Sequence, residues 1–202
     1  KGIAEMEYPE TKKLNLVENI FGQMIEDPYR WLEDFTSDES REWVEKQNIL
    51  TDKFLSNPYQ KNLKKELEDI WVSDQISIPY RKGDKTFYFF NDGKKQQSVF
   101  MVRGCDDCEA KVLLDPNNFS NDGTISLGDV SVSPDGKKIA YSISDGGSDW
   151  RTWKVMDIET KEDLVDKIEW SKFSYATWES DSSGFYYQKY EKPDEALADV
   201  NR

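Results

Sequence analysis

The feature of this sequence that most restricts its fold is a strand, tight turn and strand that recur along the last two thirds of the chain. One copy spans Val130–Tyr141 and another spans Ala176–Tyr187. Aligned on the turn glycines Gly83, Gly136 and Gly184, the copies lie 53 and 48 residues apart. A period of this length is typical of a repeat built from propeller blades and their loops.

Between these turns lie short segments rich in aromatic and β-branched residues, which predict antiparallel strands. The first four are expected at residues 76–80, 86–90, 98–103 and 111–114, with turns at 82–84, at Asp92-Gly93 and around two cysteines. Four strands per period joined by tight turns indicate a β-propeller. We therefore predict a mainly β chain with about two and a half four-stranded antiparallel blades, at 73–120, 124–170 and 171–202.

Residues 1–72 follow a helical pattern instead. The string Thr36-Ser37-Asp38-Glu39 is typical of a capping box and predicts a helix start. Asn57-Pro58 predicts the end of that helix and the start of the next. Apolar or mostly apolar stripes at helical spacing follow these signals, at Trp43, Gln47, Leu50 and Phe54, and then at Leu63, Leu67, Ile70 and Trp71.

The number of blades leads to a further expectation. Propellers close with about four to eight blades, so two and a half blades cannot form a ring. We expect the chain to be part of a longer protein, and its start at Lys1 suggests missing upstream sequence. The compartment, cytoplasmic or periplasmic and secreted, therefore stays open.

The charge of the chain limits its partners. The sequence has 40 acidic and 27 basic side chains, a formal net charge of −13. This charge repels phosphate backbones and anionic lipids, so we expect no nucleic-acid or membrane partner. Aromatic residues still make up 13% of the chain, which predicts a packed globular protein rather than a disordered one.

The two cysteines, Cys105 and Cys108, form a C-x-x-C motif. Zinc requires four ligands, and the sequence offers neither a histidine nor a third cysteine, so no metal is expected. A redox dithiol is disfavoured because Asp106, Asp107 and Glu109 would raise the pKa of the thiols. We predict a tight hairpin loop, and whether the two cysteines are bridged stays open.

Catalytic chemistry is also restricted by composition. A Ser-His-Asp triad needs an imidazole, and the chain contains no histidine. The segment Gly146–Trp150 lacks the second glycine of a G-x-S-x-G nucleophile elbow. The many serines and lysines of the chain show no spacing that would indicate a Ser-Lys dyad. We predict that this chain alone is catalytically inactive, and we expect no cofactor.

Several strings closely resemble the opening of the prolyl oligopeptidase family. They are Tyr8-Pro9-Glu10-Thr11, Phe21-Gly22, Asp27-Pro28-Tyr29-Arg30-Trp31-Leu32-Glu33-Asp34 and Trp43-Val44-Glu45-Lys46-Gln47-Asn48. Others resemble the first blades of that family's propeller, namely Gln97-Ser98-Val99, Leu113-Leu114-Asp115-Pro116-Asn117, Gly147-Ser148-Asp149-Trp150 and Lys172-Phe173-Ser174. The resemblance covers nearly the whole chain.

The resemblance implies a helical arm that packs on a C-terminal α/β-hydrolase domain, with a seven-bladed propeller that gates access for short proline-containing peptides. It also implies roles for two residues. Asp149 would face the hydrolase domain and pair with an arginine beside its active site, and Phe173 would line the same cavity. Without the resemblance, Asp149 is more simply a turn residue that accepts backbone N–H bonds. Phe173 is more simply a core aromatic.

Two alternatives remain at this point. The chain could be a free-standing propeller-type module that binds a peptide or a sugar on its aromatic surface. It could also belong to a related oligopeptidase or aminopeptidase of different specificity. The Asp27–Asp34 string favours a peptidase over a free module, because a free module needs no arm that grips a hydrolase domain.

Overall fold

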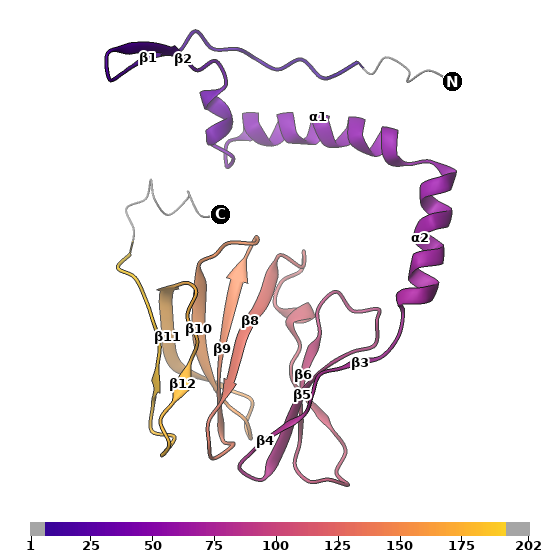
Figure 1. Cartoon of the computed structure of the whole chain (residues 1–202), viewed down its shortest axis with the longest axis vertical. Coiled ribbons are helices and arrows are strands. Elements are labelled where there is room, and N and C mark those ends of the chain that lie inside the picture. Colours follow the sequence, from indigo (N-terminus) through magenta and orange to yellow (C-terminus); the bar gives the residue numbers. More distant parts are fainter. Residues whose placement is uncertain (1–6, 193–202) are drawn as a thin grey trace. The chain divides into compact units, whose positions relative to one another are not determined.

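The computed structural model describes residues 7–192 (Figure 1). The chain divides into two compact units, residues 1–70 and residues 71–202, and each is described by itself. The first unit holds a short hairpin and helices, and the second consists of antiparallel sheets. None of the helices in the described range is long and apolar enough to cross a membrane.

The first unit begins with an antiparallel hairpin of β1 (Val17–Ile20) and β2 (Gln23–Glu26). A 3-10 helix (Arg30–Glu33), α1 (Asp38–Leu55) and α2 (Pro58–Trp71) follow. The helices α1 and α2 begin where the capping and proline signals predict helix starts.

The start of α1 differs by one residue from the expected capping box. Ser37 rather than Thr36 is the N-cap, and its hydroxyl accepts a hydrogen bond from the backbone N–H of Ser40. Glu39 does not close a box with Thr36, because its carboxylate accepts a hydrogen bond from Lys12 Nζ at 2.7 Å. The prediction of a hydroxyl cap is thus confirmed, but the capping residue is Ser37 instead of Thr36.

The Asp27–Asp34 string fixes the entry to α1. Arg30 Nε donates to Asp27 at 2.5 Å and the same guanidinium pairs with Glu18 of β1. The hydrogen bonds that Arg30 donates to these two carboxylates raise the pKa of Arg30. The indole N–H of Trp31 donates to the carbonyl of Lys12 at 3.0 Å. The string thus ties the hairpin and the N-terminal segment to one turn of helix.

The apolar side chains of the two helices are largely uncovered within the described part of the chain. In α2 no residue is buried, and Ile70 is 78% exposed. In α1 only Ser40 is buried, and the predicted stripe from Trp43 to Phe54 is half-buried at most. Because helices of this length gain most of their stability from packing an apolar face, these faces lack a cover here.

The second unit opens with a sheet of antiparallel strands in the order β3-β5-β6-β7, with β4 also paired to β5. A single strand over 76–80 is wrong in detail, because this region forms two short strands. The pairs Gln75↔Asn91 and Tyr80↔Phe87 differ in register by one residue, which places a bulge around Pro79. Proline has no N–H for the ladder. The strands are β3 (Gln75–Ile76), β4 (Tyr80–Lys82), β5 (Lys85–Asn91), β6 (Val99–Arg103) and β7 (Lys111–Leu114).

A second antiparallel sheet and a hairpin follow. The sheet has four strands in chain order, and the hairpin pairs Trp178 with Phe185. Figure 1 shows these sheets as successive blades that do not close into a ring. The predicted fold class, a mainly β partial propeller preceded by helices, is confirmed. The strands are β8 (Ile125–Val132), β9 (Lys138–Asp145), β10 (Arg151–Asp157), β11 (Asp163–Ser171), β12 (Thr177–Trp178) and β13 (Phe185–Tyr186).

The core lies between the blades, because the sheet of β8–β11 is buried on both faces. Side chains alternate along β9, so Ile139 and Tyr141 face the first blade while Ala140 faces the third. Ile139 packs in a cluster with Phe87 and Phe100 of the first sheet. Ala140 belongs to a second cluster in which Trp153 is fully buried, with Trp178 and Phe185 of the hairpin packed against it.

The inner turns are those at Lys82-Gly83-Asp84, at Pro134-Asp135-Gly136 and at 179–182, and each contacts the next. Their geometry corrects the repeat alignment. Gly136 (φ +69°) donates its backbone N–H to Ser133, and Ser182 (φ +63°) donates in the same way to Glu179. Ser182 is therefore the equivalent of Gly136, and the alignment on Gly184 is wrong by two residues. A left-handed serine is strained relative to glycine, but its hydroxyl accepts a hydrogen bond from the backbone N–H of Asp135 at 3.1 Å.

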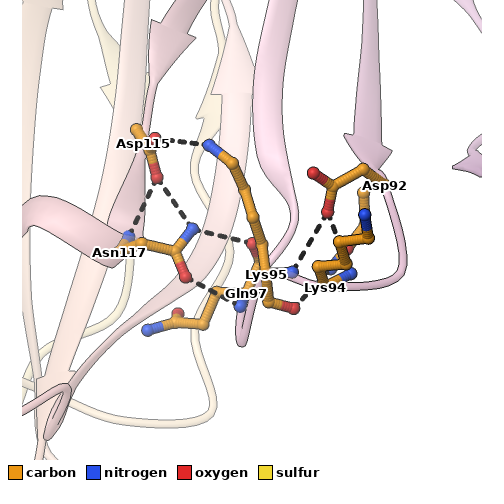
Figure 2. Close-up of polar contacts among 7 residues, drawn as sticks. Asp92, Lys94, Lys95, Gln97, Asp115 and Asn117 are labelled. Atoms are coloured by element: carbon orange, nitrogen blue, oxygen red, sulfur yellow. Dashed lines mark hydrogen bonds and ion pairs between the residues drawn. The ribbon is translucent and has the colours of Figure 1, made fainter. Parts of the chain in front are cut away.

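A polar network in the first blade, which we call the inter-blade clasp, consists of Asp115, Asn117 and Gln97 (Figure 2). Asp115 accepts hydrogen bonds from the side chains of Asn117 at 2.8 Å and Lys95 at 2.9 Å. The side-chain amide of Asn117 exchanges two hydrogen bonds with the backbone of Gln97, at 3.0 and 2.9 Å. Partial burial disfavours the charged carboxylate, but the hydrogen bonds from Lys95 and Asn117 outweigh it and lower the pKa of Asp115.

The side chain of Gln97 connects the inter-blade clasp to the second blade. Its side-chain amide donates to the carbonyl of Ile125 at 2.9 Å and accepts from the N–H of Leu127 at 3.1 Å. The amide thus takes the place of a neighbouring strand along the first residues of β8. Because each half-buried backbone group needs a partner, the clasp fixes where β8 starts relative to the first blade.

The two cysteines lie at the tip of the β6–β7 hairpin, as the predicted loop requires. They are joined by a disulfide, with a sulfur–sulfur distance of 2.03 Å, which resolves the question that the sequence leaves open. The N–H of Cys108 donates to the carbonyl of Cys105 at 3.2 Å, so the loop is a tight turn. Among the described residues, no cluster of acidic, cysteine or histidine side chains could hold a metal ion.

Candidate functional site

Asp149 lies in the loop between β9 and β10. Gly146 and Gly147 both adopt left-handed backbone conformations there, with φ values of +57° and +76°. Consecutive residues of this kind turn the chain sharply and favour glycine. The N–H of Gly146 donates to the carbonyl of Thr124 at 3.2 Å, which anchors the loop to the segment before β8. This turn leaves the side chain of Asp149 exposed to solvent.

The simpler explanation for Asp149, a turn residue that accepts backbone hydrogen bonds, does not hold. That role belongs to Ser148, whose hydroxyl accepts from the backbone N–H of Trp150 at 3.1 Å. Within residues 7–192 the carboxylate of Asp149 makes no hydrogen bond or ion pair. An exposed carboxylate with no counter-charge can pair with a cation from another domain.

Phe173 follows β11 and is not a core aromatic. Its side chain is 70% exposed, and its backbone has φ +52°, an uncommon value for a non-glycine residue. Burying a phenylalanine side chain gains roughly 1.5–3 kcal/mol, so leaving it exposed forgoes this stabilisation. The ring of Phe173 is therefore available to a partner outside the described residues.

The register of β10 and β11 brings Asp149 and Phe173 to the same end of the second blade. Arg151 pairs with Ser171 across these antiparallel strands, and each candidate lies two residues beyond that pair. Their neighbours are in contact, because Lys172 Nζ lies 4.4 Å from the ring centroid of Trp150. The two residues named from the sequence therefore flank one cation–π contact.

An aromatic cluster surrounds this contact. Trp150 meets Trp170 edge to face, with ring centroids 5.6 Å apart, and meets Tyr190 in the same way at 5.9 Å. Lys172 Nζ also lies 5.5 Å from the ring of Tyr190. The backbone N–H of Tyr190 donates to the carbonyl of Trp170 at 2.8 Å, which joins the two segments whose rings contact Trp150. Edge-to-face pairs of this kind add stability beyond the area they bury.

Sequence reasoning missed the role of Trp170, Lys172 and Tyr190. Trp150 and Lys172 lie in strings that resemble the family, but the strings do not indicate that the two side chains meet. The available signal is the aromatic-rich run from Trp170 to Tyr175, in which alternation alone does not tell which rings face solvent. Their meeting depends on the β10–β11 register and on the irregularity of β11 around Trp170, which has φ +60°.

The chemistry that this site can perform is recognition. It offers one unpaired carboxylate, one exposed phenylalanine ring and a cluster of indole and phenol rings beside an ammonium group. A general base of the imidazole type is absent from the sequence. The fold and the site together define an incomplete β-propeller with an exposed carboxylate, an exposed phenylalanine and an aromatic cluster at one end of its second blade.

The family follows from comparison with known proteins. The model of the prolyl oligopeptidase N-terminal β-propeller domain matches residues 8–201. Because this match spans nearly the entire chain, the chain belongs to the prolyl oligopeptidase family and corresponds to its N-terminal propeller domain.

Similar proteins agree with this assignment. A prolyl endopeptidase of Elizabethkingia miricola is 41% identical over 93% of this chain and 26% of the relative. A prolyl endopeptidase of Elizabethkingia meningoseptica is 42% identical over 94% of this chain and 27% of the relative. The chain therefore spans about a quarter of the length of these relatives.

Solved structures show the same fold. A structure from a mechanistic study of two prolyl endopeptidases matches with a TM-score of 0.79 and 34% identity, over 94% of this chain and 28% of that one. Prolyl oligopeptidase B from Galerina marginata, bound to a 25-residue macrocyclization substrate, matches with a TM-score of 0.73 and 28% identity, over 94% and 30%.

Proposed function

We propose that this chain is the non-catalytic N-terminal portion of a prolyl oligopeptidase-like serine endopeptidase that cleaves short peptides after proline. Its propeller blades restrict access to a C-terminal α/β-hydrolase domain, which supplies the Ser-His-Asp triad. The observation that carries the proposal is the family match over residues 8–201, because relatives of this kind are prolyl endopeptidases about four times as long.

In this proposal the helical unit, residues 1–72, grips the hydrolase domain. The exposed apolar side chains of α1 and α2 support this role, because contiguous exposed apolar surface marks an interaction site. Asp149 pairs with an arginine of the hydrolase domain, and Phe173 lines the cavity between the domains. Their exposure at one strand end supports both assignments.

The test is complementation. The 202-residue chain and a separately produced hydrolase domain of a similar prolyl endopeptidase are assayed, alone and mixed, on a chromogenic peptide with proline before the scissile bond. We expect no hydrolysis by the chain alone and proline-specific cleavage on mixing. Hydrolysis by the chain alone would contradict the inactive assignment.

The Asp149→Asn variant tests the proposed charge pair in the same assay. It keeps the size of the side chain and removes its charge, so it should weaken complementation without unfolding the chain. Asp145→Asn is the matched control, since Asp145 is an exposed carboxylate at the end of β9, directly before the same loop. Cleavage after a residue other than proline would favour a related oligopeptidase. No hydrolysis by the mixture, with both pieces shown to be folded, would favour a free binding module.

A further inference from the structure

The tip of the β6–β7 hairpin carries the two cysteines of the chain as an exposed disulfide. Cys105 and Cys108 lie three positions apart, and both are exposed to solvent. Gly104 precedes them, and apart from its chain neighbours no atom lies within 4 Å of a Cβ added there. The disulfide is therefore open to a reagent that approaches from solvent.

The hairpin does not depend on the disulfide for its pairing. β6 and β7 pair from Phe100↔Leu114 to Val102↔Lys111, and Phe100 and Leu114 are buried in the core between the first two blades. A disulfide stabilises a protein mainly by closing a loop in the unfolded chain, and this effect is smallest for short loops. The loop here is short, so reduction should open the tip and leave the blade folded.

Acidic side chains surround the disulfide. Asp106 and Asp107 lie between the two cysteines and Glu109 follows them, and all three are exposed. Within residues 7–192 none of these carboxylates forms a salt bridge. The nearest cations in the sequence, Arg103 and Lys111, lie outside the loop at the ends of β6 and β7. The charged groups of the loop itself are therefore all negative.

These charges decide which part the loop can take in thiol–disulfide exchange. Carboxylates disfavour a neighbouring thiolate, so the reduced cysteines supply little of the nucleophile that attacks another disulfide. The oxidised loop needs no thiolate of its own, because an external thiolate attacks it. The carboxylates repel that thiolate unless its carrier also bears positive charge. The loop is thus a target of exchange rather than a catalyst.

We propose that the Cys105–Cys108 disulfide is an exchange site that takes electrons from a dithiol whose reactive thiol lies beside positive charge, and that it discriminates against anionic dithiols. A thiolate of the dithiol attacks one cysteine sulfur, the bond between the cysteines breaks, and the other cysteine leaves and takes up a proton. The second thiolate of the dithiol attacks the mixed disulfide and releases the first cysteine. The dithiol loses two protons and two electrons and becomes a disulfide, and the chain gains two thiols.

The hairpin tip lies apart from the candidate site around Asp149. The turn between β10 and β11 contacts β7 directly after the cysteine loop, because Lys161 Nζ donates to the carbonyl of Val112 at 2.9 Å. The loop that carries Asp149 joins β9 to β10 and lies at the other end of β10. The exchange site is therefore separate from that site, and the inference goes beyond the proposed function without resting on it.

The experiment compares the reduction of the folded 202-residue chain by a cationic dithiol, 2-aminobutane-1,4-dithiol, and an anionic one, dihydrolipoate. Iodoacetamide traps the thiols and mass spectrometry counts them, which is unambiguous because the sequence has two cysteines. Each rate is divided by the rate of the same reagent with bis(2-hydroxyethyl) disulfide, which corrects for its intrinsic reactivity. We expect a preference of about tenfold for the cationic dithiol at low salt, which should fall to about twofold or less near 1 M salt.

A double variant, Asp106→Asn with Asp107→Asn, removes the two charges between the cysteines. Its preference for the cationic dithiol at low salt should fall to about threefold or less. The matched control is Asp145→Asn with Glu169→Gln, which removes two exposed carboxylates at the other end of the second blade. The control should keep the preference of the wild type.

Circular dichroism of the chain before and after reduction tests whether the disulfide serves only to hold the hairpin. We expect the same spectrum in both states. Loss of β structure on reduction, or reduction only in urea concentrations that unfold the chain, would overturn the proposal in favour of a purely structural disulfide. Equal preference in the Asp106 and Asp107 variant and in the wild type would overturn the role of the charges.

Discussion

Single side chains replace backbone hydrogen bonds where the first two blades meet. The amide of Asn117 pairs with the backbone of Gln97, and the amide of Gln97 pairs with the backbone of β8. Each amide supplies one donor and one acceptor, which is what an extended backbone residue needs. Removing one amide therefore leaves a donor and an acceptor without partners at a half-buried position.

Gln97→Ala should lower the free energy of unfolding by about 2 kcal/mol, since two hydrogen bonds to β8 are lost and their backbone partners stay behind. Gln96→Ala is the matched control, because Gln96 precedes it and is exposed. Urea unfolding followed by circular dichroism measures both. Equal stability of the two variants would show that the clasp does not hold the blades together.

The carboxylate of Asp115 makes the clasp sensitive to acid. Its pKa in the folded chain is lower than its ordinary value of 3.8, through hydrogen bonds from Lys95 and Asn117. A carboxyl group with a lowered pKa stabilises the folded state above its unfolded pKa, and this contribution is lost as the pH falls through the folded value. The stabilisation is therefore complete above about pH 5 and declines below about pH 4.

The comparison of the wild type with Asp115→Asn isolates this effect from the other aspartates with lowered pKa values. The difference in free energy of unfolding between the two should be largest near pH 6 and should shrink toward pH 3. Urea titrations at several pH values in this range measure it. A difference that stays constant with pH would mean that the charge of Asp115 does not contribute.

The residues of the candidate site could be named from the sequence only in part. Asp149 and Phe173 were proposed from strings that resemble a family, and the structure leaves both exposed. The cation–π contact of Lys172 with Trp150 could not be predicted, because it follows from the pairing of Arg151 with Ser171. Strand register over a 20-residue separation is not encoded by local propensity.

At the scale of elements, the inner turns show how one backbone shape is built from different residues. Gly136 and Ser182 take the same left-handed position in successive blades. The sequence pattern predicts the hairpins, because apolar strands flank each turn. It misplaces the third turn, because glycine is a stronger turn signal than serine, although Ser182 gains a hydrogen bond from Asp135 that glycine could not accept.

Gly136→Ala should destabilise the chain by about 2 kcal/mol or more. A left-handed alanine costs about 1–2 kcal/mol, and its Cβ would lie 2.5 Å from the carbonyl oxygen of Lys82. Gly184→Ala should change the stability by less than about 0.5 kcal/mol, since that glycine has no atom within 4 Å of an added Cβ. Urea unfolding of both variants measures the difference, and a greater loss for Gly184→Ala would restore the original alignment.

Other elements differ from the sequence pattern for local reasons. The strand expected at residues 76–80 is divided near Pro79, because proline breaks the ladder with β5. The N-cap of α1 is Ser37 rather than Thr36, because the sequence pattern alone does not tell which of two neighbouring hydroxyl residues caps the helix. These changes leave the order of elements as predicted.

At the scale of the whole molecule, the two compact units differ in how much they bury. β9 and β10 contain Ile139, Tyr141 and Trp153 in the cores between blades. The helices α1 and α2 bury almost nothing within the described part of the chain. The repeat in the sequence predicted the first property, because blades must pack face to face. The amphipathic stripes predicted apolar helix faces. In the proposed function these faces pack on the hydrolase domain, which lies outside the printed sequence.

This contrast predicts a pattern of amide hydrogen exchange. Local opening costs little where few apolar contacts are broken, so amides of α1 and α2 should exchange faster than those of β9 and β10, by about tenfold or more. Exchange of the 202-residue chain, followed by mass spectrometry of its peptides, measures this. Adding the separately produced hydrolase domain should then slow exchange in α1 and α2 and leave β9 and β10 unchanged, because the helices gain a cover whereas β9 and β10 are already buried between blades. Helices as protected as β9 in the isolated chain would show that they are already stable alone, and no slowing on addition would contradict their role as an arm.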